Sequence, residues 1–109
     1  AGLGEAFSPT DLLAAALGSC VLTTMGIVAR RNGWNLEGSV ARVVKTMTSQ
    51  PSRRVGSLAV TFELPEGLTE KARIILQRAA YACPVHRSLS PEIETVFKFS
   101  WGLADCPDV

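Results

Sequence analysis

The chain has 109 residues, of which 47% are hydrophobic, and 11 basic and 10 acidic side chains give it a formal net charge of +1. This length fits a single domain, residues 1–109, with enough apolar side chains for a core. The nearly balanced charge argues against nucleic-acid binding, which needs a clustered basic surface to neutralise phosphates. Three widely spaced cysteines, Cys20, Cys83 and Cys106, do not form the dense framework of a small secreted domain, so we expect a reducing, cytoplasmic compartment.

A long helix is predicted over Pro9–Arg31. Ser8 is a suitable N-cap, Asp11 suits the positive end of the helix dipole, and Asn32-Gly33 is a stop signal. The stretch Leu12–Ala29 carries no charge and reaches the lower length limit for a membrane span. Its many small and hydroxyl-bearing residues, and the lack of a positively charged segment before it, favour a buried helix over a membrane segment or a signal peptide.

The remaining elements alternate between strands and a helix. Strands are predicted over Ser39–Thr48 and Leu58–Leu64, where the second shows clear alternation of apolar and polar residues. A second helix follows the N-cap Thr69 and is expected to end at Pro84, and a last strand covers Ile93–Trp101. The order of helix, strand, strand, helix, strand predicts an α+β fold.

The predicted first helix is apolar on every face, and three strands provide little cover for it. We therefore expect that either strands are missing from the front of this chain or a partner subunit covers the helix.

The sequence surroundings of the three cysteines do not by themselves predict a reactive thiol. Cys20 lies in the middle of an apolar helix, where burial raises the pKa of a thiol, so a packed core cysteine is its simplest interpretation. Cys83 is expected to end a helix whose dipole disfavours a thiolate, which makes it a poor first nucleophile but a workable second one. Cys106 lies between carboxylates, which predicts no catalytic role for it.

The spacing Cys83-Pro84-Val85-His86 can chelate a metal or tune a thiol. A structural zinc site usually needs four ligands, and the chain offers no second close pair of ligands, so no metal site is predicted. The alternative interpretation of His86 is a lone exposed histidine after a helix.

Two blocks of the sequence together resemble the OsmC/Ohr superfamily. They are Ser8–Cys20, with the sequence SPTDLLAAALGSC, and Cys83–Leu89, with the sequence CPVHRSL. The order of elements between the blocks is similar too, so the resemblance covers nearly the whole chain. It implies two long helices packed against an antiparallel sheet in an intertwined homodimer, with the sites at the dimer interface and the front strands absent from this chain.

The resemblance also implies a thiol peroxidase. Cys20 would attack a hydroperoxide and become a sulfenic acid, Cys83 would condense with it to a disulfide, and a dithiol reductant would reset the pair. No metal or organic cofactor is implied, because sulfur carries the chemistry. The competing interpretations are a non-catalytic protein of this fold that binds a small apolar ligand at the dimer interface, and a zinc-binding module.

In the family, an arginine oriented by a glutamate stabilises the attacking thiolate. Thr10 stands at the glutamate position here, and the nearest acid, Asp11, is expected on the opposite face of the helix from Cys20. The arginine usually comes from an N-terminal strand. Candidates to replace it are Arg87, Arg30 and Arg31, and a basic group near Cys20 would separate the catalytic from the non-catalytic interpretation.

Overall fold

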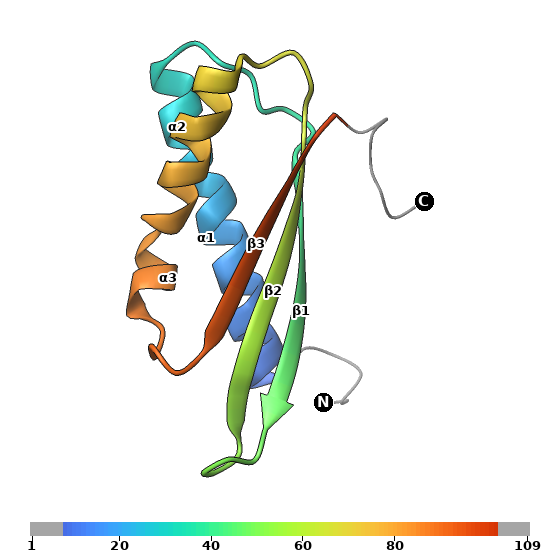
Figure 1. Ribbon diagram of the computed structural model, residues 1–109, viewed down its shortest axis with the longest axis vertical. Coiled ribbons are helices and arrows are strands. Elements are labelled where there is room, and N and C mark those ends of the chain that lie inside the picture. Colours follow the sequence, from blue (N-terminus) through green and yellow to red (C-terminus); the bar gives the residue numbers. More distant parts are fainter. Residues whose placement is uncertain (1–7, 103–109) are drawn as a thin grey trace.

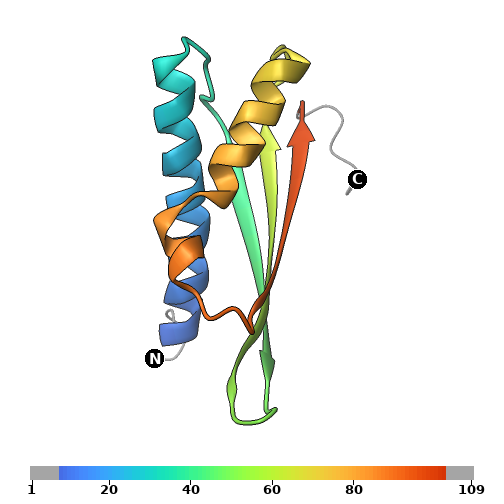
Figure 2. The same ribbon diagram turned by 60° about the vertical axis from the view of Figure 1, so that its left-hand side comes forward.

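A computed structural model describes residues 8–102 of the chain. The elements are α1 (Pro9–Arg31), β1 (Val40–Thr48), β2 (Arg54–Leu64), α2 (Glu70–Tyr81), α3 (Pro84–Ser88) and β3 (Glu94–Trp101). The helices lie together on one side of the sheet, as Figures 1 and 2 show from two directions. This arrangement confirms the predicted α+β class.

Helix α1 begins and ends where the sequence predicts. Ser8 Oγ accepts a hydrogen bond from Asp11 N at 3.2 Å, and the Asp11 carboxylate accepts one from Ser8 N at 3.3 Å. This capping box satisfies N–H groups that lack helical partners in the first turn. Asn32 caps the other end, and Gly33 follows with a φ of 76°, a left-handed conformation that glycine adopts at low cost.

Only one face of α1 is buried within the chain. Leu17, Val21 and Met25 are fully buried against the rest of the domain, whereas Leu12 is 55% and Ile27 42% exposed. The prediction of burial on most sides is therefore not met within a single chain. Helix α1 is long and apolar enough to cross a membrane, but the core helices of soluble proteins can have the same length and composition. Of the 18-residue apolar stretch of α1, 33% is buried within the structure.

The sheet is mixed, with strand order β1-β2-β3. Strands β1 and β2 pair antiparallel, and β2 and β3 pair parallel, with Phe62 opposite Phe99. The expected antiparallel sheet is thus wrong for the second pair. The physical reason is the crossover: α2 and α3 carry the chain back along the sheet, so that β3 starts at the same end as β2 (Figure 1).

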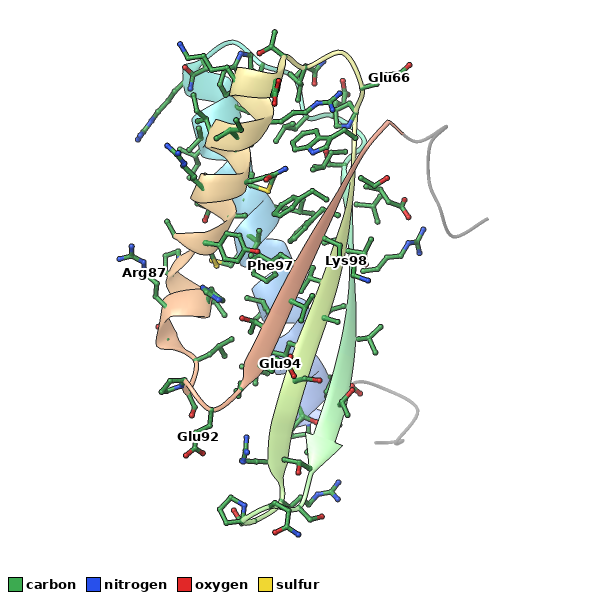
Figure 3. The ribbon with its side chains drawn as sticks, in the orientation of Figure 1. Glu66, Arg87, Glu92, Glu94, Phe97 and Lys98 are labelled. Atoms are coloured by element: carbon green, nitrogen blue, oxygen red, sulfur yellow. The ribbon has the colours of Figure 1, made fainter. Side chains whose placement is uncertain are left out.

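The core lies between the helices and the sheet. The alternating apolar residues of β2 are buried as predicted, and Phe62 contacts the rings of Phe97 and Phe99 at centroid distances of 5.5 and 5.1 Å. In Figure 3 Phe97 points toward the helices, whereas Lys98 points to the opposite face of the sheet. Helix α1 packs on α2, α3 and β1, and this packing brings the middle of α1 beside the start of α3.

Candidate thiol site

Cys20 lies in the middle of α1, as predicted. It is half-buried and packs at the border of the core rather than inside it. A residue inside a helix has no free backbone N–H of its own, because that group is bonded to the carbonyl four residues earlier. Any hydrogen bond that stabilises a Cys20 thiolate must therefore come from a side chain or from another element.

Cys83 does not end α2, so the predicted effect of that helix's dipole is wrong. Helix α2 ends at Tyr81, with Ala82 as its C-cap, and Cys83 is the N-cap of the short helix α3. The Cys83 Sγ atom accepts a hydrogen bond from His86 N at 3.4 Å. An N-cap position supplies donors to sulfur, whereas a C-terminal position would supply none.

The fold brings the two cysteines into contact. Within this contact the Cys83 side chain, the Val85 backbone N–H and the Thr24 side chain are the groups whose hydrogen bonding lowers the pKa of Cys20. Thr24 follows Cys20 by one helical turn, so both side chains lie on the same face of α1. Val85 belongs to the first turn of α3, whose N–H groups have no helical partners.

These contacts separate the acidities of the two thiols. Burial alone would raise the pKa of Cys20, but the hydrogen bonds from Cys83, Val85 and Thr24 outweigh it and lower that pKa below its ordinary value. Burial, followed by the hydrogen bond that it donates to Cys20, raises the pKa of Cys83. Cys83 is completely buried, whereas Cys20 is partly accessible. Of the two thiols, Cys20 is the one that ionises first.

Charged groups do not contribute to this shift within residues 8–102: every cause of the lowered Cys20 pKa is a neutral donor. Of the candidate arginines, Arg87 is exposed and points away from the helices in Figure 3. Arg30 and Arg31 lie in the last turn of α1, ten and eleven residues beyond Cys20. Asp11 is occupied in the capping box and pairs with Lys45 at 2.8 Å, so it serves the start of α1 rather than the thiols.

The remaining candidates do not form a metal site in the described part of the chain, where no three His, Cys, Asp or Glu residues come together. The ring nitrogens of His86 contact Tyr81 O and Thr95 Oγ1, each at 3.2 Å. Cys106 lies outside the described residues.

Sequence reasoning missed two donors. Thr24 carries a detectable signal, because a hydroxyl four residues after a cysteine in an apolar helix shares its face. The Val85 N–H carries none, because a backbone donor to Cys20 depends on how α3 docks on α1.

The comparisons with known proteins identify the family of the chain. The sequence matches the OsmC-like protein family over residues 2–98. The chain belongs to this family. A search of curated proteins gave no match.

Solved structures with the same fold include other members of the family. A Psychrobacter arcticus protein, provisionally named an osmotic stress induced and detoxification response protein, is 40% identical, with 89% of this chain and 70% of that chain covered and a TM-score of 0.83. An organic hydroperoxide resistance protein of Legionella pneumophila is 19% identical, with 87% of this chain and 70% of that chain covered and a TM-score of 0.73. Bacillus subtilis OhrB is 15% identical, with 92% of this chain and 76% of that chain covered and a TM-score of 0.72.

Proposed function

We propose that this OsmC-like protein is a thiol peroxidase that reduces organic hydroperoxides or hydrogen peroxide. The observation that carries the proposal is the contact between Cys20 and Cys83, with three donors to the Cys20 sulfur and a lowered Cys20 pKa. A thiolate is the nucleophilic form of cysteine, and a neighbouring thiol is what a sulfenic acid needs to form a disulfide. The Legionella and Bacillus proteins, which share this fold, are named organic hydroperoxide resistance proteins, and this supports a hydroperoxide as the substrate.

The first step consumes the peroxide. The Cys20 thiolate attacks the terminal oxygen of ROOH, the O–O bond breaks, and the leaving RO⁻ takes a proton to become ROH. Cys20 becomes Cys20–SOH, so sulfur has lost two electrons to the peroxide. A partly exposed thiolate suits this step, because the peroxide must reach the sulfur.

The second step forms the disulfide. Cys83 attacks the Cys20 sulfur, the S–O bond breaks, and water leaves with the proton of the Cys83 thiol. A dithiol reductant then reduces the Cys20–Cys83 disulfide and is itself oxidised to a disulfide, which completes the cycle. Cys83 already interacts with Cys20, which favours condensation of the two sulfurs.

The proposal includes a homodimer in the cytoplasm. Apolar side chains remain exposed on the outer side of α1 and on the sheet face away from the helices: Leu12, Ile27, Val44 and Val96. An obligate dimer would cover such surfaces with a total interface on the order of 2,000 Å² or more. Sedimentation of the full chain at micromolar concentration should give a dimer, and a stable monomer would contradict this part of the proposal.

The activity is tested by peroxide consumption with a dithiol reductant. The wild type should turn over many times, and Cys20→Ser should consume no peroxide. Cys83→Ser should complete about one turnover and then stop, because its sulfenic acid has no adjacent thiol. Cys106→Ser is the matched control and should turn over like the wild type. Absence of consumption by the wild type with several hydroperoxides would reject the peroxidase function.

A further inference from the structure

His86 lies in the short helix α3, and both of its ring nitrogens have partners. Nδ1 is 3.2 Å from the carbonyl oxygen of Tyr81, the last residue of α2, and Nε2 is 3.2 Å from Thr95 Oγ1 on β3. The ring also packs against Tyr81 and Phe97, at centroid distances of 5.9 and 5.3 Å. His86 is therefore not the lone exposed histidine of the simplest interpretation.

The two partners determine how the ring is used. A carbonyl oxygen only accepts hydrogen bonds, so Nδ1 carries the proton and donates to Tyr81 O. In the neutral ring Nε2 then accepts the hydrogen of the Thr95 hydroxyl. Through these bonds one side chain ties the end of α2 to the start of β3.

The backbone of the same residue faces the sulfur pair. His86 N donates to Cys83 Sγ at 3.4 Å, and hydrogen bonding from the preceding N–H, that of Val85, lowers the pKa of Cys20. Helix α3 has only five residues, so it has little intrinsic stability with which to hold these donors in place. Something outside α3 must fix the direction of its first turn.

We propose that His86 is a positioning residue for the thiol pair. Its ring anchors α3 to Tyr81 and to Thr95, and this anchoring holds the N–H groups of Val85 and His86 in line with the two sulfurs. The effect of His86 on turnover rests on the proposed peroxidase function, whereas its effect on thiol reactivity does not.

The test measures the rate at which iodoacetamide alkylates Cys20 as a function of pH, with mass spectrometry to assign the modified cysteine. His86→Leu removes both ring bonds, so the donors should lose their alignment and the Cys20 profile should move to higher pH. We expect alkylation at pH 7 to slow by roughly 3- to 10-fold, since a tenfold change corresponds to one pKa unit. Arg87→Gln, at an exposed neighbouring position, is the matched control and should leave the profile unchanged.

Conservative variants separate positioning from simple stabilisation. His86→Asn keeps an N–H donor near the position of Nδ1, so it should recover most of the wild-type rate. Thr95→Val removes only the second anchor, at nearly constant shape, and should move the profile in the same direction by a smaller amount. It also provides the test if His86→Leu does not fold.

Two results would overturn the proposal. The first is a lower melting temperature for His86→Leu and Thr95→Val with an unchanged Cys20 profile, which would make His86 a purely structural residue. The second is an equal shift in His86→Asn and His86→Leu, which would remove the role of the Tyr81 bond. Because alkylation needs no peroxide, these results are independent of whether the protein is a peroxidase.

Discussion

Cys20 and Cys83 contact each other, yet their surroundings differ in three respects. Cys20 is partly exposed on a long helix and receives hydrogen bonds from Cys83, Val85 and Thr24. Cys83 is fully buried, caps a short helix, and gives its own hydrogen to Cys20. Cys20 is thus a hydrogen-bond acceptor that solvent can reach, whereas Cys83 is a donor that solvent cannot reach.

Because of these differences, two chemically identical thiols acquire an order of reaction. Burial and the hydrogen bond to Cys20, together with the charge of the Cys20 thiolate, keep the proton on Cys83 while Cys20 is ionised. When Cys20 becomes a neutral sulfenic acid, its negative charge disappears. The causes that depend on this charge disappear with it, so the pKa of Cys83 should fall at the moment when Cys83 has to attack.

The largest effect expected from this comparison is a complete division of roles. Peroxide-treated Cys83→Ser protein should carry a sulfenic acid on Cys20, trapped because no adjacent thiol remains to condense with it. Mass spectrometry after dimedone labelling would identify the site, and Cys20→Ser should show no label. Oxidation of Cys106 with Cys20 still reduced would show that the assigned roles are wrong.

Much of the fold follows from local signals in the sequence. Ser8 and Asp11 mark the start of α1 because capping is a short-range interaction, and the alternation from Leu58 to Leu64 marks a strand because one of its faces is buried. The direction of β3 had no such signal. Alternation identifies a strand but is the same for both directions of the chain, so the parallel pairing with β2 depends on the path of the crossover.

The site was predictable to a smaller extent. The family resemblance brought Cys20 and Cys83 together, and the structure places them in contact. The surroundings of Cys83 were predicted wrongly because Pro84 was interpreted only as the end of α2. Proline also favours the first position of a new helix, and the five residues of α3 are too few to show helical periodicity. The Val85 donor depends on how α3 docks on α1, so it could not be predicted from the sequence.

A smaller effect should come from removing the thiol hydrogen that Cys83 supplies. Cys83→Ala deletes that donor, so the pKa of Cys20 should rise, and its alkylation at pH 7 should slow by about 5- to 10-fold because less of the thiol is ionised. Cys83→Ser retains a hydroxyl donor at the same position and should show a smaller loss. If both variants kept the wild-type alkylation profile, Cys83 would have no part in the acidity of Cys20.

The smallest effect concerns Thr24, whose hydroxyl is one of three donors and lies partly exposed to water, which can replace it. Thr24→Val removes the hydroxyl at nearly constant shape, so the pKa of Cys20 should rise, and alkylation at pH 7 should slow by about 2- to 5-fold because less of the thiol is ionised. Thr24→Ser restores the donor and should restore the rate. The position of Cys83 is unaffected by either change, so peroxide reduction by Thr24→Val should be slower at pH 6 and should approach the wild-type rate at high pH, where Cys20 is ionised in both proteins. A rate deficit that persists at high pH would mean that Thr24 acts through packing rather than through the hydrogen bond to Cys20.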